Sequence, residues 1–351
     1  MKKTLIIVVL LAVVAGGILL LSKNILPKGT GGNQPSKAAP VIIGFSLGDT
    51  LTERWLSKDT PLFSERVTQL GGVVAQAVSN NNTDTQISQI RNLISQGVKV
   101  IVIVASDSKK LAPVVAEAHA AGVKVIAYDR MISDSDLDMY ISFDSVKVGQ
   151  LEAQSVLDKV YKGNFALIGG ASSDNNAILV KQGSMSVLGA KIKSGDIKLA
   201  IDKFIDNWDP TEAYQTIKEY LASGKTLDAV VSANDGMAYG VIKALQEKGL
   251  AGKIPVSGQD AELAACQRII AGTQTSTVYK PIKSLAYKAA EEAIALAKGQ
   301  APETNNQINN GKIDVPSFLL EPIIVNKDNL MSTVVKDGFQ SYSAIFNQPA
   351  K

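Results

Sequence analysis

Residues 100–130 read VIVIVASDSKKLAPVVAEAHAAGVKVIAYDR and decide the class of fold. Five apolar β-branched residues open this stretch, an amphipathic segment follows at 110–121, and a second, largely apolar run spans 124–128. A short apolar run, a helix-length segment and another short apolar run predict a βαβ unit, whose two strands lie parallel in one sheet. Gly122 follows the predicted helix directly, where a C-terminal cap is expected. The stretch therefore predicts an α/β protein.

The same alternation continues on both sides of this unit. Strands are predicted at 41–46, 73–77, 100–104, 124–128, 140–143, 165–168, 229–232, 256–258 and 276–279. Helices are predicted at 53–70, 85–96, 110–121, 146–161, 177–188, 211–222, 237–248, 263–271 and 281–298. This number of βα units is too large for one small sheet, so we expect two doubly wound parallel-sheet lobes of the Rossmann type.

The composition limits the class of protein. With 351 residues and 46% hydrophobic content, the chain is long enough for about two domains with buried cores. The 36 basic and 33 acidic residues are spread along the chain, without a block of like charge or a basic stripe interleaved with aromatics. Nucleic acid is therefore not an expected partner.

Single cysteine and histidine residues restrict disulfide and metal chemistry. Cys266 is the only cysteine, so no disulfide forms within the chain, and His119 alone cannot build a histidine metal cluster. The acidic residues at 134–138 resemble the start of an EF-hand loop, but Met139 stands at the glycine position and Ser145 at the bidentate glutamate position. We therefore expect no metal site and no cofactor.

The amino terminus has the pattern of an export segment. Two lysines precede an apolar run at 5–21, which is 17 residues long and would reach about 25 Å as a helix. No lipobox cysteine follows, and small-residue cleavage sites next to the run are poor, which favours an uncleaved anchor at 1–22 over a cleaved signal. Residues 23–40 contain a stretch rich in Gly, Pro, Ser, Asn and Gln and are expected to be a flexible tether. The globular part is expected outside the cytoplasm.

Polar side chains follow most of the predicted strands. They are Asp49, Arg54 and Trp55, then Asp129 and Arg130, Asp174 to Asn176, Asn234 and Asp235, Gln259 and Asp260, Lys280, and Trp208 in a loop at 206–210. Ligands of doubly wound sheets bind beyond the carboxyl ends of the strands, so these residues are candidates for one site. Carboxylates, amides and cations suit the hydroxyls of a sugar, and the chain's only two tryptophans can cover the apolar faces of its ring.

Each of these residues also has a structural alternative. Asp174 and Asp235 are suited to cap helices, Asp129 and Arg130 can form an ion pair at the end of the sheet, and Trp55 can be a core residue. Their coincidence at six or seven strand ends favours a binding site over these separate explanations.

Several motifs together resemble one family. They are ERW at 53–55, NNTDTQISQI at 81–90, AYDRMI at 127–132, YISFD at 140–144, DNNA at 174–177, SGQDA at 257–261, GTQTSTVYKP at 272–281 and VKDGF at 335–339. With these motifs the chain from 41 to about 338 resembles the periplasmic sugar-binding proteins of the ribose/xylose group, which have the type I periplasmic binding protein fold. Arg54-Trp55, DRMI and YKP are specific to the xylose branch, and this implies D-xylose as the ligand.

The resemblance also implies an architecture and a set of contacts. Two lobes, 41–144 plus 279–309 and 145–278 plus 310–345, would be joined by crossovers near 144–147, 276–280 and 309–314. The residues expected to contact the sugar, with the two tryptophans on its faces, are Arg54, Trp55, Asp129, Arg130, Asn176, Trp208, Asn234, Asp260 and Lys280. No catalytic residue, metal or cofactor is implied.

The expected function is that of a monomeric extracytoplasmic solute-binding protein, which closes on a monosaccharide and docks on the permease of an ABC transporter. A sugar-sensing receptor subunit for chemotaxis or signalling is the main alternative. An enzyme using Asp129 and Asp260 as acid and base is disfavoured, because the neighbouring cations should keep both carboxylates ionised. A sugar-responsive repressor is disfavoured because an apolar run and a tether stand where a helix-turn-helix would be required.

Overall fold

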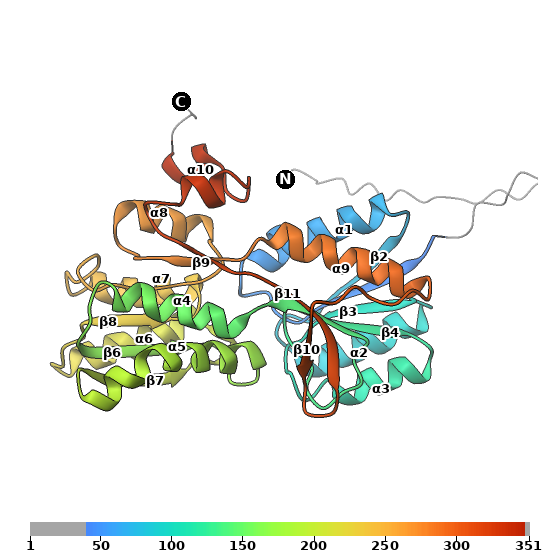
Figure 1. Ribbon diagram of the computed structural model, residues 1–351, viewed down its shortest axis with the longest axis horizontal. Coiled ribbons are helices and arrows are strands. Elements are labelled where there is room, and N and C mark those ends of the chain that lie inside the picture. Colours follow the sequence, from blue (N-terminus) through green and yellow to red (C-terminus); the bar gives the residue numbers. More distant parts are fainter. Residues whose placement is uncertain (1–39, 348–351) are drawn as a thin grey trace, which may run out of the picture. The chain divides into compact units, whose positions relative to one another are not determined.

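The strands of the first lobe form one seven-stranded sheet in the order β10-β11-β5-β4-β3-β1-β2. Figure 1 labels β2, β3, β4, β10 and β11 of this sheet. The structure is a computed structural model that describes residues 40–347. The strands are β1 (Ile42–Leu47), β2 (Val73–Val78), β3 (Val100–Val104), β4 (Lys124–Tyr128), β5 (Met139–Phe143), β10 (Asn306–Asn309) and β11 (Asp314–Leu320). All neighbouring strands pair in parallel except β10 with β11.

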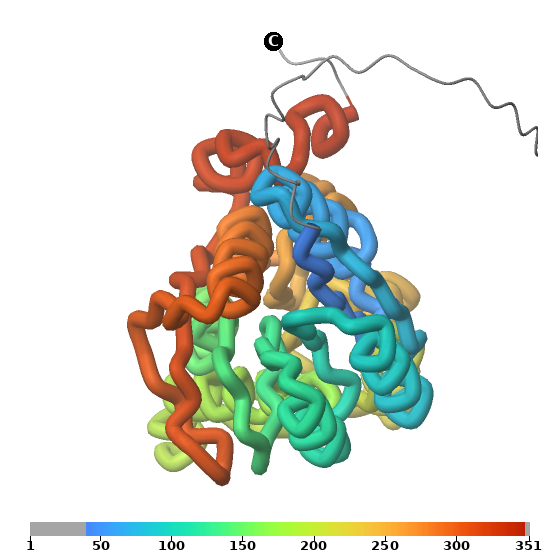
Figure 2. Tube along the Cα trace, turned by 90° about the vertical axis from the view of Figure 1, so that its right-hand side faces the viewer, coloured from blue at the N-terminus to red at the C-terminus, as the bar shows by residue number. Residues whose placement is uncertain are grey.

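Helices cover both faces of this sheet. Along β3, Val100, Val102 and Val104 belong to one core cluster, and Ile101 and Ile103 belong to another, as expected for a strand buried on both sides. The first cluster is covered by α1 (Thr60–Gln69) and α9 (Ile282–Ala297), and the second by α2 (Thr83–Ser95) and α3 (Ala112–Ala120). Figure 2 shows α9 beside α1, although more than 200 residues separate them in sequence.

The second lobe has a smaller sheet. Strands β7 (Ile197–Phe204), β6 (Gly163–Gly169) and β8 (Ala229–Ser232) are parallel. Isolated bridges lead on from β8 through residues 256 and 259 to β9 (Thr277–Tyr279), which pairs antiparallel with β12 (Ile323–Val325). The helices of this lobe are α4 (Ser145–Leu157), α5 (Asn175–Ser194), α6 (Pro210–Ala222), α7 (Asp235–Gln246), α8 (Leu263–Ala271) and the short α10 (Tyr342–Phe346).

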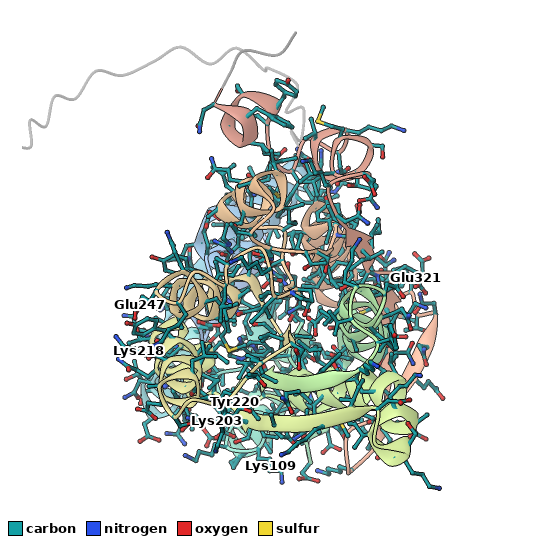
Figure 3. The ribbon with its side chains drawn as sticks, turned by 90° about the vertical axis from the view of Figure 1, so that its left-hand side faces the viewer. Lys109, Lys203, Lys218, Tyr220, Glu247 and Glu321 are labelled. Carbon is teal, nitrogen blue, oxygen red and sulfur yellow. The ribbon has the colours of Figure 1, made fainter. Side chains whose placement is uncertain are left out.

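Exposed charged residues lie on the outer helices of the second lobe. Figure 3 shows Lys218 of α6 next to Glu247, which directly follows α7, and their charged atoms are 3.2 Å apart. Both side chains are more than 40% exposed, so this ion pair contributes little to stability.

The chain passes between the lobes three times within the described residues. It leaves the first lobe after β5, returns between β9 and α9, and leaves again between β11 and β12. The expected third crossover near 309–314 is wrong, and so is the assignment of residues 310–320 to the second lobe. Residues 317–320 of β11 pair in parallel with β5, because this apolar segment completes the edge of the first sheet.

Most predicted elements are present, with some exceptions. The predicted strand at 256–258 is only an isolated bridge, and the predicted helix at 53–70 divides into a π-helix (Trp55–Asp59) and α1. Strands β7, β10, β11 and β12 were not predicted. β7 and β10 carry many polar residues, β11 contains a proline, and β12 has three residues, so none shows a clear strand pattern.

No helix among residues 40–347 is long and apolar enough to cross a membrane. The predicted anchor at 1–22 and the predicted tether up to residue 39 lie outside the described residues.

Candidate functional site

All nine residues predicted to bind a ligand line one cavity. The empty space between its lining atoms, including space open to solvent, is about 330 Å³. The lining consists of Thr52, Arg54, Trp55, Asp129, Arg130, Asp174, Asn176, Val180, Trp208, Asn234, Gln259, Asp260 and Lys280. The first lobe contributes residues that follow β1 and β4. The second lobe contributes residues that follow β6, β7, β8, the bridge at Val256 and β9. The carboxyl ends of strands from both sheets therefore converge here, as doubly wound folds predict.

Two carboxylates from opposite lobes share two cations at the centre of the cavity. Arg54 Nη1 lies 3.0 Å from Asp129 Oδ2 and 3.6 Å from Asp260 Oδ1. Lys280 Nζ lies 3.1 Å from Asp260 Oδ1 and 3.8 Å from Asp129 Oδ2. Burial acts to raise the pKa of Asp129. The neighbouring cations, of which Lys280 has the largest effect, outweigh burial and lower this pKa. Asp129 is therefore an ionised hydrogen-bond acceptor at neutral pH.

Three site residues have a backbone conformation that L-residues rarely adopt. The φ angle is 61° at Asp129, 57° at Trp208 and 97° at Asp260. Hydrogen bonds hold two of them in place, from Asp129 N to Ile141 O (2.7 Å) and from Asp260 N to Val278 O (2.9 Å). Strained positions of this kind cluster at functional sites, where the surrounding structure fixes them.

The two tryptophans are held in different ways. Trp55 donates from Nε1 to Asp49 Oδ2 at 3.0 Å, and the guanidinium of Arg54 lies 4.2 Å from the centre of its ring. Trp208 Nε1 is buried without a hydrogen-bond partner among the described residues. A Cβ at Gly170 would come within 2.3 Å of the Trp208 ring, so the ring packs directly on this glycine.

The structural alternatives are partly confirmed. Trp55 is also a core residue, since it is 2% exposed and packs in the same cluster as Phe63 and Val67. Asp174 does cap α5, accepting from Asn176 N at 2.9 Å. The cap of α7 is Asn234, not Asp235, with Met237 N as its donor at 2.8 Å.

The chain is similar in sequence to known proteins over most of its length. Residues 43–301 match the family described as "Periplasmic binding protein domain". The chain is 48% identical over 314 residues to the D-xylose-binding periplasmic protein of Escherichia coli (strain K12), with 89% of this chain and 95% of that protein covered. It is 45% identical over 306 residues to the protein of the same name in Haemophilus influenzae, with coverages of 87% and 92%.

The chain belongs to the periplasmic binding protein family. A solved structure agrees: the carbohydrate transporter solute binding protein from Chloroflexus aurantiacus, in complex with D-glucose, has a TM-score of 0.80 at 32% identity and covers 88% of this chain and 98% of its own. The predicted family resemblance and the predicted type I fold are confirmed.

The two lobes of this periplasmic binding protein contact each other around the cavity. Asn176 Nδ2 of the second lobe donates to the Asp129 carbonyl (2.7 Å) and to Asp129 Oδ1 (3.1 Å). Tyr140 OH donates to Asn176 Oδ1 at 3.3 Å, and Ser108 N donates to Ser173 O at 2.9 Å. Arg130 Nε lies 2.7 Å from Asp174 Oδ2, so this ion pair joins the lobes as the pair of Arg54 with Asp260 does.

Sequence reasoning missed several residues that shape the cavity of this binding protein. Val180 lies one turn after Asn176 on the same face of α5, and this spacing is a signal that would have found it. Asp59 binds the side chain of Arg54 from behind, and its five-residue separation fits a π-helix and not the α-helix predicted there. Thr52 precedes the π-helix and carries no distinctive pattern.

The arrangement suits a ligand with many hydroxyl groups. Cations and side-chain amides supply donors, carboxylates supply acceptors, and two aromatic rings supply apolar faces. Among residues 40–347, no group of three or more His, Cys, Asp or Glu side chains is placed to hold a metal ion.

Proposed function

We propose that this periplasmic binding protein captures D-xylose between its lobes, outside the cytoplasm, and delivers it to the permease of an ABC transporter. The observation that carries the proposal is the cavity to which both lobes contribute opposite charges and one tryptophan each. The specific sugar is supported by two relatives named as D-xylose-binding periplasmic proteins, which are 48% and 45% identical to the chain over most of its length.

Each side chain has a chemical role in this proposal. Arg54, Arg130 and Lys280 donate hydrogen bonds to sugar hydroxyls. The carboxylates of Asp129 and Asp260 accept hydrogen bonds, and the amides of Asn176 and Asn234 contribute at the edges. Trp55 and Trp208 cover the two faces of the pyranose ring and exclude water. Charge-assisted hydrogen bonds are stronger than neutral ones, so the central cations and carboxylates would provide most of the polar affinity.

Sugar binding and lobe closure are coupled in this proposal. A sugar that contacts Asp129 of the first lobe and Asp260 of the second binds best when the lobes are together. It would therefore shift the population toward the closed form, which is the form that would dock on the permease. The protein is proposed to act as a monomer, because one chain supplies both halves of the cavity.

Isothermal titration with D-xylose, ribose, arabinose and glucose tests the binding step. We expect D-xylose to bind with micromolar or tighter affinity, and we expect each of the other three sugars to bind more weakly. Asp260→Asn is expected to weaken binding strongly, whereas Asp107→Asn, at a half-buried residue outside the cavity, is the matched control. Binding of none of these sugars in the micromolar range would overturn the proposal.

Uptake measurements separate transport from sensing. Cells that lack this chain are expected to lose high-affinity uptake of labelled xylose and to regain it when the chain is restored. Unchanged uptake together with a lost chemotactic response to xylose would instead assign the chain to sensing.

A further inference from the structure

Asp49 lies directly beyond β1 and is only 1% exposed. Neither the predicted set of sugar contacts nor the cavity lining includes it. Both of its carboxylate oxygens nevertheless accept several hydrogen bonds; Thr52 donates to both oxygens, and every other partner donates to only one of them. The division between them points to a role beyond local folding.

The Oδ1 atom of Asp49 holds its own loop. It accepts from Leu51 N at 2.8 Å, from Thr52 N at 3.4 Å and from Asn81 Nδ2 at 3.4 Å. This is the turn that Asp side chains commonly form with the backbone two residues later. These contacts leave the carboxylate in a single orientation, with Oδ2 directed toward the cavity residues.

The Oδ2 atom binds three residues that line the cavity. Trp55 Nε1 donates to it at 3.0 Å and Arg130 Nη2 donates to it at 2.7 Å. These donors come from segments 75 residues apart in sequence, and a single oxygen atom joins them. Thr52 Oγ1 adds a third hydrogen bond at 3.1 Å.

We propose that Asp49 is a positioning residue, which fixes the plane of the Trp55 ring and the direction of the Arg130 guanidinium before a sugar arrives. The inference rests on the proposed function, since it concerns how that same cavity is prepared. The only other carboxylate that pairs with Arg130 at hydrogen-bond distance within residues 40–347 is Asp174. Asp174 belongs to the second lobe, where it caps α5, so Asp49 is the partner that the first lobe itself supplies.

The charge state of Asp49 agrees with this role. Burial acts to raise its pKa, but the charge of Arg130 and the hydrogen bonds from Leu51, Trp55 and Thr52 outweigh burial and lower it. An ionised carboxylate has no donor hydrogen, so it can accept from the indole and the guanidinium together.

A fluorescence comparison tests the inference without any sugar. Trp208→Phe leaves Trp55 as the only tryptophan of the chain. In this background, Asp49→Asn is expected to shift the Trp55 emission and to increase its quenching by acrylamide, because the indole loses its charged acceptor. Asp107→Asn is the matched control, since Asp107 holds a similar turn after β3, through Lys109 N and Lys110 N, and does not line the cavity. Equal spectra of the Asp49 variant and its parent would overturn the inference.

Titration with D-xylose tests the consequence for affinity. Asp49→Asn in the otherwise native chain is expected to weaken binding by about tenfold or more, as loss of a charged hydrogen-bond partner does. Combined with Trp55→Phe, it is expected to weaken binding by less than the product of the two separate factors, because both changes remove the same contact. The positioning role would be contradicted if the double variant lost affinity by the full product of the two separate factors. It would also be contradicted if the affinity of Asp49→Asn for D-xylose stayed within twofold of the native value.

A further variant keeps the inference testable if Asp49→Asn does not fold. Replacement of Trp55 by benzothienylalanine keeps the size of the ring and removes only its N–H donor. It is expected to weaken xylose binding several-fold with little change in thermal stability, and unchanged binding would overturn the role of the hydrogen bond. If the native chain binds none of the sugars, the proposed function fails, while the fluorescence comparison still decides whether Asp49 positions Trp55.

Discussion

Asp59 binds the guanidinium of Arg54 at two of its three nitrogen atoms. Arg54 Nε donates to Asp59 Oδ2 at 2.9 Å, and Arg54 Nη2 donates to Asp59 Oδ1 at 2.6 Å. Tyr128 OH donates to the same Oδ1 at 2.6 Å. Only Nη1 of Arg54 remains directed at the central carboxylates, 3.0 Å from Asp129. Asp59 therefore determines which donor Arg54 presents to the cavity.

Asp59→Asn is expected to weaken both folding and sugar binding. The free energy of unfolding should fall by about 3 kcal/mol, because the variant leaves a buried cation with one partner fewer. Xylose affinity should fall about tenfold or more, since Nη1 is no longer held in one direction. Chemical denaturation and calorimetric titration measure the two effects. Glu291→Gln, which breaks the partly exposed ion pair with Arg66, is the control and should cost less than about 1 kcal/mol.

Gly170→Ala is expected to displace Trp208. The new Cβ would lie 2.3 Å from the ring, so the indole must move, and we expect xylose to bind about tenfold more weakly with an altered tryptophan emission. Gly189→Ala is the matched control. A Cβ at Gly189 meets nothing within 4 Å in the interior of α5, so this change should leave affinity unchanged and stabilise the fold by about 0.5–1 kcal/mol. Equal affinities of the two variants would show that Gly170 does not constrain the ring.

Lys280→Met is expected to make sugar binding depend on pH. The pKa of Asp129 lies below its usual value, so the ionised carboxylate and its contribution to binding persist in the native protein at pH 5 and above. Lys280 is the charge that lowers this pKa most, and without it burial should raise the pKa. Xylose affinity of the variant should then decline as the pH falls from 7 to 5, while that of the native chain stays level. Titrations at several pH values measure this, and Lys283→Met, at an exposed lysine, should behave like the native chain.

Glu152→Gln is expected to change how stability depends on pH. Glu152 of α4 is fully buried, and neither of its carboxylate oxygens has a hydrogen-bond partner among the described residues. Burial first, and then the nearby charge of Asp260, raise its pKa well above the usual value, although Lys280 acts in the opposite direction. The folded state therefore holds this proton more tightly than the unfolded state. The protonated Glu152 side chain therefore contributes to the free energy of unfolding in full below about pH 4. This contribution is lost as the pH rises toward the pKa of Glu152 in the folded protein.

The variant should accordingly be more stable than the native chain at pH 8, by about 1–2 kcal/mol, and no more stable at pH 4. Denaturation curves at both pH values check this. Glu321→Gln, at an exposed residue, should leave the pH dependence unchanged. If the free energy of unfolding of Glu152→Gln changed with pH as it does in the native chain, the Glu152 carboxylate would be ionised in the folded protein.

The central parallel strands of the first lobe, β1, β3, β4 and β5, were predictable because most of their residues are buried on both faces of the sheet. Strand β3 is a continuous run of β-branched residues, and its neighbours β1 and β4 follow similar patterns between glycine-capped helices. The antiparallel edge strand β10 was not predictable, whereas the other edge strand, β2, was predicted from its apolar residues. The β10 sequence NQIN is polar and mostly exposed, and it forms a strand only because β11 is beside it.

The candidate contacts were predictable where they follow a strand directly. Asp129 follows β4 and Lys280 follows β9, so their position in sequence already placed them at the edge of a sheet. Asp59, which holds Arg54 from behind the cavity, and Val180, which lines the cavity, were missed because both lie within helices, where one side chain among many gives no separate signal.

The sequence by itself determined the α/β class and most strand-end candidates, because periodic burial and strand-end polarity are local properties of the chain. The resemblance of its motifs to one family implied the two lobes and the nine residues that converge on one cavity. Only the tertiary structure decided that β11 completes the first sheet, that Asp59 sets the direction of Arg54 and that a single oxygen of Asp49 joins Trp55 to Arg130. These relationships depend on distances between segments far apart in the chain, and packing alone sets those distances.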